Sequence, residues 1–514
     1  LAIRGSVGDP VVAGRRMRGR SSGWGGDPEI LRTPAAKMGA QRDRHFLNPK
    51  KALGQFFTPP RLAAWMVETA LLWLPRPASM LDPACGDGAF LEPAARLGIR
   101  EVVGVEIDPQ ILAAARERLG GRPQVSLIEG DALRLVRDLE GRFDLVAANP
   151  PFSAKYGRVR DPRLLGQFAL GAGRRSEAVE ALFLELSVRA LREGGVLAIV
   201  LPDGLLSGLP NQRAREWLIQ QVRPLAIVGL SRKLFPAKTC VLFARKGGPP
   251  ERVRLAHAED EEDLDRIAEE IRRGGGLLLP PEALGSSWSP LHHLTPPPPP
   301  APFPTLPLGD LLIEMRGGRA PKQGLSGSGV PLLSAKVVAP WGVDLRRDGR
   351  RIPSGETAGR SGPQARKGDV LFVRVGVGCI GRAAVVLDED EEGVADDCLY
   401  ILRFRRERML PEFFALLTQT GFFRLALRRI QRGTGTVTVP QRLLRTLPVP
   451  VPPLCVQASF AKAYRRLHRR AREGGTPQEE ARRIVARLEA LLSGGGKETA
   501  ARQREGACPP GALT

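Results

Sequence analysis

Cysteine is scarce in this chain of 514 residues, and long apolar runs are missing from it. The six cysteines are scattered, without a CxxC pair or a histidine at zinc-ligand spacing. We therefore expect free thiols, a reducing compartment and no metal. No apolar run reaches the roughly 18 residues of a membrane span, and the Gly- and Arg-rich start lacks a signal-peptide core. These absences predict a cytoplasmic protein.

Positive charge is what the chain has in excess. It contains 77 Lys and Arg against 55 Asp and Glu, a formal net charge of +22. Such an excess favours a polyanionic partner, with nucleic acid first and an anionic membrane surface second. The chain is also rich in Ala, Gly and Pro, so the composition of a GC-rich genome is an equally good explanation of the charge alone.

Short apolar runs alternate with amphipathic helical patterns from about Phe56 to Phe243, which predicts a doubly wound α/β sheet. The candidate strands are SMLDPA, VVGVEID, FDLVAANP, GVLAIVLP and AIVGL. A charged helical stretch and five consecutive prolines at 296–300 follow, and a proline run of this kind acts as a semi-rigid spacer. We therefore expect a domain boundary there.

The second half reads as short strands interrupted by Gly and Pro, with one helix at 411–430 and one basic helix from about Gln457 to Leu492. The expected organisation is a poorly ordered extension (1–45), an α/β domain (46–245), a charged helix with a Pro-rich linker (246–304), a second domain (305–453), a helical tail (454–495) and a disordered tail (496–514).

Three acidic turns follow successive candidate strands. The first is the turn from Asp82 to Gly88, where small residues let a ligand approach the backbone. The second strand ends in Glu106, which suits hydrogen bonds to ribose hydroxyls. The third turn carries Asp131, whose carboxylate could accept a hydrogen bond from an adenine amine. The glycine spacing differs from GxGxxG, which argues against a dinucleotide.

Helix capping is the alternative role for Asp87, Asp108 and Asp131, because aspartate is a preferred cap residue. Taken singly, each acid fits that role about as well as ligand binding. Taken in order along one edge of an open α/β sheet, where such sheets bind ligands, the series favours a cofactor site.

The candidate strand FDLVAANP leads into Asn149-Pro150-Pro151-Phe152. Asn and Pro are common in loops without chemistry, but this tetrad follows the acidic series. An exocyclic amine is a poor nucleophile because its lone pair is delocalised into the ring. The side-chain carbonyl of Asn149 and the backbone carbonyl of Pro150 can accept its N–H bonds and free that lone pair. Pro151 stiffens the backbone, and Phe152 can stack on the base.

The ordered motifs resemble those of the γ-class N6-adenine DNA methyltransferases. They are GQFFTPP (54–60), LDPACGDGAF (81–90), VGVEIDP (103–109), GDAL (130–133), NPPF (149–152) and GGVLAIVLP (194–202). The resemblance implies a Rossmann-like domain that transfers a methyl group from S-adenosylmethionine to an adenine flipped out of DNA. Similar tetrads also occur in methylases that act on RNA and on protein glutamine.

The resemblance also implies roles for individual residues. The implied cofactor-binding residues are Gln55, Thr58, Asp82, Ala84, Gly86, Glu106, Ile107, Asp131 and Ala132. The tetrad is implied to be catalytic, and Phe235 is implied to stack on the target base opposite Phe152. The family more often has Tyr at the position of Phe152, and Phe keeps the stacking surface.

Residues 305–453 resemble the target-recognition domain of such enzymes and of type I specificity subunits, which implies an α+β domain followed by a C-terminal helix. The candidate DNA contacts are Arg316, Arg319, Lys322, Lys336 and Arg374, and a solvated surface charge is the alternative for each. The implied partner is double-stranded DNA, with a separate endonuclease or specificity subunit as a further possibility.

Three functions remain open on the sequence. The first is a DNA adenine methyltransferase of a restriction-modification or phage-defence system, acting alone or as the modification component of a larger complex. The second is an RNA or protein amino-group methyltransferase. The third is a non-catalytic nucleic-acid-binding adaptor, which the intact Asn149 and the intact glycine-rich turn disfavour. We see no PD…ExK-like nuclease core.

Overall fold

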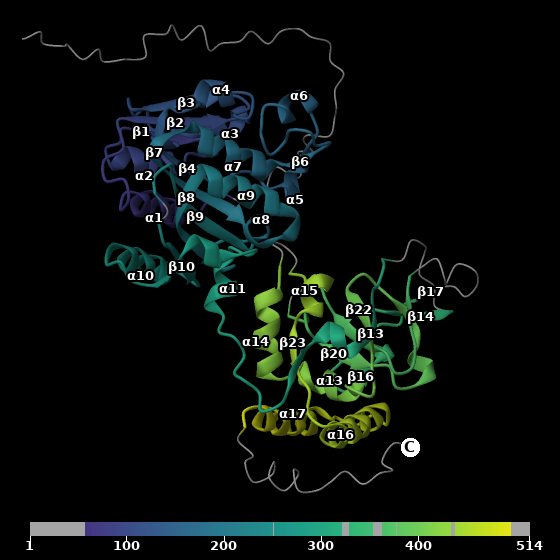
Figure 1. Cartoon of the computed structure of the whole chain (residues 1–514). Coiled ribbons are helices and arrows are strands. Elements are labelled where there is room, and N and C mark those ends of the chain that lie inside the picture. Colours follow the sequence, from purple (N-terminus) through teal and green to yellow (C-terminus); the bar gives the residue numbers. More distant parts are fainter. Residues whose placement is uncertain are drawn as a thin grey trace, which may run out of the picture. The chain divides into compact units, whose positions relative to one another are not determined.

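The computed structural model describes residues 57–249, 251–320, 328–352, 362–376, 378–432 and 437–494 (Figure 1). The N-terminal extension, Gln55, Lys322 and the C-terminal tail predicted above lie outside the described residues. Among the described residues, no helix is long and apolar enough to cross a membrane.

A nine-stranded sheet occupies the first half, in the order β11-β10-β8-β9-β7-β4-β1-β2-β3. Neighbouring strands are parallel except for β9 and β11, which run antiparallel to the strands they pair with. Its strands are β1 (Ser79–Asp82), β2 (Glu101–Glu106), β3 (Val125–Glu129), β4 (Phe143–Ala148), β7 (Leu191–Pro202), β8 (Val222–Leu230), β9 (Thr239–Lys246), β10 (Val253–Ala258) and β11 (Leu277–Leu279).

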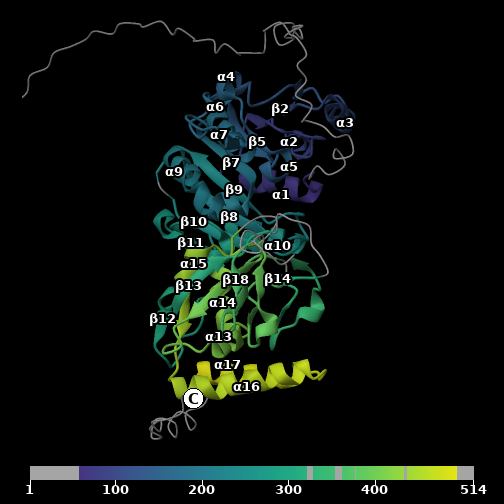
Figure 2. The same ribbon diagram turned by 90° about the vertical axis from the view of Figure 1, so that its right-hand side faces the viewer.

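Helices cover both faces of this sheet (Figures 1 and 2). They are α1 (Pro60–Ala70), α2 (Leu91–Arg96), α3 (Pro109–Leu119), α4 (Val136–Leu139), α7 (Val179–Ala190), α8 (Asp203–Ser207), α9 (Gln212–Gln221), α10 (Glu261–Arg272) and α11 (Pro290–Leu294). Alternate strand residues face opposite cores, as the two-residue period of a strand requires. Leu81 packs with α4, α7 and α9, whereas Met80 packs with α1, α2, α3 and α10. The predicted doubly wound fold is confirmed.

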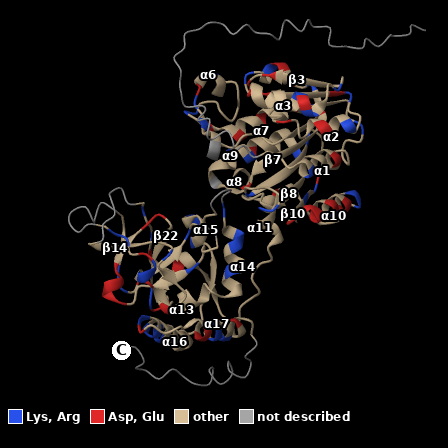
Figure 3. Ribbon diagram, turned by 180° about the vertical axis from the view of Figure 1, so that it is seen from behind, with Lys and Arg blue, Asp and Glu red and all other residues tan. Residues whose placement is uncertain are grey.

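The sheet extends further along the chain than we expected. Strands β10 and β11 belong to it, so α10 connects two of its strands and is not part of a linker at 246–304. The apolar stripe of α10 (Leu264, Ile267 and Ile271) is buried in the core, and the indole nitrogen of Trp65 donates to the Leu264 carbonyl (2.6 Å). Charged positions cover the rest of α10 (Figure 3), which made the segment resemble a solvated spacer.

A chain excursion separates β4 from α7. It contains the short elements α5 (Ser153–Tyr156), β5 (Arg158–Val159), α6 (Pro162–Leu165) and β6 (Glu177–Ala178). Strands β5 and β6 pair with each other. The excursion begins at the predicted catalytic tetrad.

The second half contains two small four-stranded sheets and the expected helices, so the predicted α+β class is confirmed. One sheet is β13-β22-β19-β20 and the other is β17-β14-β21-β18. Their bounds are β13 (Leu312–Gly317), β14 (Val330–Leu333), β17 (Arg351–Ile352), β18 (Gln364–Ala365), β19 (Val370–Val373), β20 (Ala383–Val385), β21 (Gly393–Ala395) and β22 (Leu399–Phe404). Two further strand pairs are β12 (Thr305–Pro307) with β23 (Pro448–Pro450) and β15 (Val338–Ala339) with β16 (Gly342–Val343).

Both long helices expected in the second half are broken. The stretch 411–430 forms α13 (Pro411–Leu417) and α14 (Gly421–Ile430), and Thr420 caps α14 by accepting the Phe423 amide. The C-terminal stretch forms α16 (Leu454–Arg472) and α17 (Gln478–Leu492). Gly474 between them has a φ of +84°, which ends a helix readily because glycine tolerates that conformation. A further short helix among the described residues is α15 (Gln441–Arg445).

Candidate active site

Four parallel strands of the large sheet end at one edge, and a polar residue stands at or directly after each end. Strands β2, β1, β4 and β7 are neighbours in register. They end at Glu106, at Asp82, just before Asn149 and just before Asp203, respectively. The carboxyl ends of parallel strands are where open α/β sheets bind ligands.

The turn after β1 is built around Asp82 and Gly86. Asp82 is fully buried, and its Oδ1 accepts the Ala84 amide (3.1 Å). The Gly86 amide donates to Oε2 of Glu106 (3.0 Å), which ties this turn to the end of β2. Gly86 has a φ of +55°, and the ring of Phe57 lies 3.7 Å from where a Cβ would stand. The backbone of this turn at Gly86 is therefore not covered by a side chain of its own, and it lies beside the aromatic ring of Phe57.

Burial raises the pKa of Asp82 to about 8. Its Oδ2 has no hydrogen-bond partner among the described residues. A buried carboxyl group with an unused acceptor is costly unless a partner is supplied. The ammonium group of a bound amino-acid moiety would be such a partner, because it both donates a hydrogen bond and favours the carboxylate form.

The end of β2 combines a polar and an apolar feature. Oε1 of Glu106 accepts the Asp108 amide (3.0 Å), and each carboxylate oxygen retains capacity for a second donor. Ile107 is 67% exposed, an unusual state for a large apolar side chain beside a ligand edge. Asp108 caps α3 by accepting the amides of Gln110 and Ile111, so capping is its structural role.

The remaining predicted cofactor residues are placed as follows. Oδ1 of Asp131 accepts the Leu133 amide (3.0 Å), and Oδ2 lies 3.4 Å from Nε of Arg134. Ala132 and Thr58 are buried, and Thr58 precedes α1. Asp87 pairs with Arg118 (2.7 Å), so neither Asp87 nor Asp108 is left as a free ligand acid.

The donor set of this edge fits S-adenosylmethionine. Asp82 offers an unused buried acceptor to the ammonium group, Glu106 offers acceptors to ribose hydroxyls, and exposed Ile107 offers an apolar surface to the adenine ring. The cofactor's affinity for this chain would therefore reside in β1, β2 and the turns that follow them.

The tetrad begins where β4 leaves the core. All six residues of β4 are buried, whereas Asn149 and Pro151 are half-buried. Phe152 is 7% exposed and Phe235 is fully buried. Their ring centroids are 6.4 Å apart, with ring planes at 53°. The structure thus brings together the two aromatic residues that lie far apart in the sequence.

A base between two parallel rings needs about 7 Å, twice the ordinary carbon–carbon contact distance. The 6.4 Å separation of Phe152 and Phe235 is slightly less than this. A base that entered between them would therefore have to move one ring.

Asp203 is a residue of this edge that the sequence analysis missed. It is 1% exposed, and its Oδ2 accepts the Ser207 hydroxyl (3.0 Å) and lies 3.2 Å from Nζ of Lys238. Its Oδ1 accepts the hydroxyl of Ser289. The Asp203 amide also donates to the Lys238 carbonyl (3.1 Å). Asp203 thus binds Lys238 through both its backbone and its side chain, and Lys238 follows Phe235 by three residues. The position of Asp203 directly after GVLAIVLP was the available signal.

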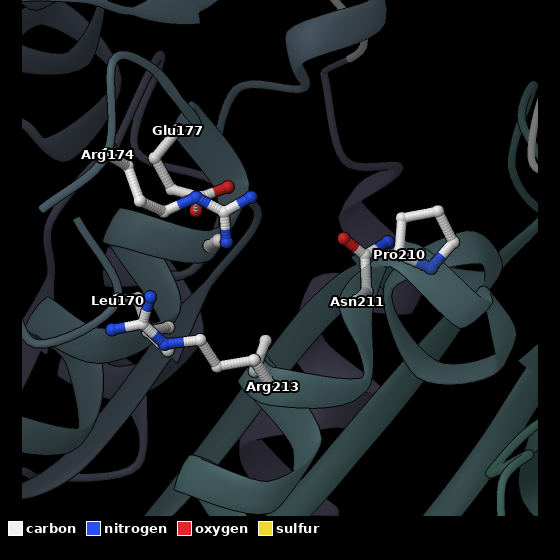
Figure 4. A pocket seen from close by; sticks show the side chains of 8 residues that line it. Leu170, Arg174, Glu177, Pro210, Asn211 and Arg213 are labelled. Atoms are coloured by element: carbon white, nitrogen blue, oxygen red, sulfur yellow. Dashed lines mark ion pairs between the residues drawn. The ribbon is translucent and has the colours of Figure 1, made fainter.

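A pocket beside the excursion is bordered by Arg174, Asn211 and Arg213 (Figure 4). Nε of Arg174 lies 3.0 Å from Oε2 of Glu177, and Nη2 of Arg213 donates to the Ala169 carbonyl (2.8 Å). Both guanidinium groups therefore have protein partners, and we assign no ligand to this pocket.

The candidate DNA contacts differ in how they are held. Arg319 and Lys336 are exposed, and Arg316 pairs with Glu314. Arg374 donates from Nε to the Asp397 carbonyl (2.8 Å), and its guanidinium lies 5.1 Å from the ring centroid of Tyr400. Basic positions that the sequence analysis did not single out lie on α14 (Figure 3): Arg424, Arg428 and Arg429.

Comparison with known proteins supports the interpretation of the first half. The family model "N-6 DNA Methylase" matches residues 44–270. The type II methyltransferase M.TthHB8I of Thermus thermophilus is 34% identical over 212 residues, which cover 38% of this chain and 46% of that protein. A tRNA (guanine(10)-N2)-dimethyltransferase of Methanothermobacter thermautotrophicus is 31% identical over 176 residues, 33% of this chain and 47% of that protein.

This chain spans about half the length of these curated relatives. Among solved structures, the type IIG restriction endonuclease BpuSI is similar over 88% of this chain and 66% of its own, with 16% identity and a TM-score of 0.44.

The matched segment contains the turn after β1, the tetrad and the two neighbouring aromatic residues, Phe152 and Phe235. The family resemblance drawn from the motifs is therefore confirmed over residues 44–270, the segment that matches the N-6 DNA methylase family model.

Proposed function

We propose that this chain transfers the methyl group of S-adenosylmethionine to the N6 amine of an adenine flipped out of double-stranded DNA. The observation that carries this proposal is the position of the tetrad. Asn149 follows β4 at the edge where β1 and β2 end in Asp82 and Glu106. The aromatic residue of the tetrad, Phe152, lies beside Phe235.

S-adenosylmethionine would supply a methyl group already activated on a sulfonium. In our proposal Asp82 and Thr58 hold its methionine end, with Ala84 and Gly86 forming the turn around it. Glu106 holds the ribose, Ile107 and Ala132 contact the adenine ring, and Asp131 accepts from the adenine amine. Gln55 belongs to the same motif as Thr58. No metal is needed for a transfer of this kind.

The tetrad would orient the target amine and free its lone pair. The side-chain oxygen of Asn149 and the carbonyl of Pro150 each accept one N–H bond, which draws the nitrogen out of conjugation with the ring. The lone pair forms the new N–C bond, the C–S electron pair remains on sulfur, and the amine proton leaves to solvent. Pro151 restricts the backbone so that the carbonyls keep their aim.

The second half would supply the DNA contacts. In our proposal residues 305–453 form a target-recognition domain in which Arg316, Arg319, Lys322, Lys336 and Arg374 lie near phosphates or bases. Neutralising phosphates with Lys and Arg provides most of the sequence-independent affinity for DNA. We place the protein in the cytoplasm, on the nucleoid, as a modification enzyme of a restriction-modification or phage-defence system with a possible endonuclease or specificity partner.

An RNA substrate is the second candidate. The observation that favours it is the similarity of the catalytic segment to the tRNA dimethyltransferase, which is 31% identical over 176 residues. The basic charge of the chain suits either nucleic acid.

A direct methyl-transfer assay separates these candidates. The purified chain is incubated with methyl-labelled S-adenosylmethionine and, in parallel, with unmethylated bacterial DNA, with tRNA and with a protein extract. We expect label in DNA, recovered as N6-methyl-2'-deoxyadenosine after digestion to nucleosides. Label confined to tRNA or protein would overturn the proposal, and label in N4-methylcytosine would overturn the choice of base.

A further inference from the structure

The excursion between β4 and α7 begins with the catalytic tetrad, yet its elements are too short to form a core of their own. Helix α5 has four residues and strand β5 has two. Three buried glutamates, one in β6 and two on α7, bind residues of the excursion. They are Glu177, Glu180 and Glu185, which are 6%, 8% and 2% exposed.

Glu180 binds the residue directly after the tetrad through both of its carboxylate oxygens. Oε2 accepts the Ser153 amide (2.8 Å), and Oε1 accepts the Ser153 hydroxyl (2.9 Å). Glu180 itself lies in the first turn of α7, where the helix dipole stabilises a negative charge.

The geometry explains why a remote carboxylate is needed at this point. Ser153 is the first residue of α5, and the amides of a first turn have no partner within the helix. A polar N-cap side chain usually serves them, but the N-cap of α5 is Phe152, which makes no such bond. Glu180 takes over that function from α7, 27 residues along the chain.

We propose that Glu180 is a positioning residue for the catalytic tetrad, an inference that rests on the proposed methyl transfer. The Ser153 amide belongs to the same peptide group as the Phe152 carbonyl. Fixing that peptide plane restrains the backbone that carries the Phe152 ring and, through the rigid Pro151, the direction of the Pro150 carbonyl. Glu180 touches neither substrate nor cofactor and acts on the turnover through Ser153.

Glu185 provides a matched control on the same helix. Its Oε1 and Oε2 accept the amides of Ala169 (2.7 Å) and Leu170 (2.8 Å). Glu185 is therefore a second buried glutamate that binds two backbone amides of the same excursion. These amides lie 16 and 15 residues before Glu185 in the sequence, well past the tetrad. Loss of Glu185 should weaken the excursion without turning the tetrad.

The experiment compares Glu180→Gln and Glu185→Gln in the full chain. Glutamine keeps the size of the side chain and one acceptor oxygen, but it loses the charge and places an amide donor against Ser153. Steady-state methyl transfer to unmethylated DNA, the KM for S-adenosylmethionine and the melting temperature are measured for both variants. We expect Glu180→Gln to lower kcat by about 10²-fold, since misplacements of about 1 Å cost that much, with KM for the cofactor unchanged.

Both variants should lower the melting temperature by a similar amount. Glu185→Gln should leave kcat within about twofold of the unmodified chain. A Glu180→Gln enzyme that keeps kcat within about twofold would overturn the inference. Equal losses of kcat in the two variants would also overturn it, since a purely structural role predicts them. Unmodified chain that methylates no DNA would instead overturn the proposed function.

Ser153→Ala tests the same contact from the other side and leaves the sequence of α7 unchanged. It removes the hydroxyl donor and keeps the backbone amide that Glu180 binds. We expect a smaller loss of kcat, about threefold to tenfold, again with the KM for the cofactor unchanged. A loss as large as that of Glu180→Gln would show that the hydroxyl has a function of its own and would overturn the role assigned to the carboxylate.

Discussion

The candidate residues at the carboxyl ends of β1 and β2 and those in the second half of the chain are held in place by different kinds of contact. At the edge formed by the carboxyl ends of the parallel strands, Asp82 and Glu106 stand at the ends of β1 and β2 and accept backbone amides of the adjacent turns. Glu106, for example, binds the amides of Gly86 and Asp108. In the second half, the candidate arginines stand on or beside short strands and differ in their partners. Arg316 pairs with Glu314, whereas Arg374 donates to the Asp397 carbonyl.

This difference teaches which functions can be placed from a sequence. A small-molecule site made of turns is encoded locally, because strand, turn and acid are neighbours in the chain. A DNA surface depends on which charges stay unneutralised after folding, and exposed ion pairs contribute only about 0–1 kcal/mol each. The contrast predicts large, specific effects at the sheet edge and small, graded effects in the second half.

The largest effect should come from Asn149→Ala. This variant removes one of two acceptors for the target amine, and removal of a single preorganised hydrogen-bond partner typically costs about 10²–10³ in kcat. Single-turnover methyl transfer measures the loss, while calorimetric binding of S-adenosylmethionine should remain within about threefold. Transfer at an undiminished rate would contradict the role of Asn149 as an acceptor for the target amine. It would also remove the expected difference in effect between the sheet edge and the second half.

A second prediction concerns Asp82 and pH. Burial raises its pKa to about 8, above the unfolded value of 3.8, so the free chain is destabilised as pH rises from about 4 to 8. A cofactor ammonium favours the carboxylate, so binding at pH 7 should release up to about one proton and should weaken up to about tenfold per pH unit below 8. Calorimetry in two buffers of different ionisation enthalpy measures the release. The isosteric Asp82→Asn variant should abolish it, and buffer-independent enthalpies in the unmodified chain would contradict the assignment.

A smaller effect is expected for Arg374, with Arg316 as its comparison. Arg374 is held by the Asp397 carbonyl and by the Tyr400 ring. No acidic side chain among the described residues pairs with it, so its charge remains available to a phosphate. Arg374→Ala should weaken DNA binding about threefold to tenfold and reduce the salt slope by about 1. Arg316→Ala should change both less, since Glu314 already neutralises that charge. Fluorescence anisotropy at several salt concentrations measures both values, and equal slopes for the two variants would remove Arg374 from the DNA surface.

The smallest effect should be a pH dependence of the C-terminal helices. Burial lowers the pKa of His468, but hydrogen bonds and charges of Glu391 and Asp388 outweigh it and raise the pKa overall. The stabilisation is therefore complete below the unfolded pKa of about 6.5 and is lost as pH rises through the folded value. We expect the melting temperature to fall by about 2 °C across that range. The fall should be absent in His468→Gln, and an identical profile in the variant would remove His468 as its cause.

Much of the sheet and its edge could be predicted because the signals are local. Asp82, Glu106 and Asn149 each stand at the end of an apolar run, and a parallel sheet brings such ends together. The role of Asp203 could not be predicted, because its partners Lys238 and Ser289 are distant in sequence and only the fold brings them to it. Glu180 was missed for the same reason.

The errors in the helices have physical causes as well. Helix α10 looked like a solvated spacer because its charges outnumber its apolar stripe, although Leu264 and Ile267 follow the spacing of a buried face. The long C-terminal helix breaks at Gly474, and that glycine was a visible stop signal. In the second half, strands of two or three residues carry too little periodicity to place a side chain on a face.

Methylation-aware sequencing of host DNA tests the central claim most directly. The chain and its Asn149→Ala variant are expressed separately in a bacterial host without adenine methyltransferases of its own. We predict N6-methyladenine at one defined sequence motif in cells with the unmodified chain and none in cells with the variant. Genomes free of N6-methyladenine in both, with the unmodified chain folded and bound to S-adenosylmethionine, would contradict the assignment of DNA adenine as its target.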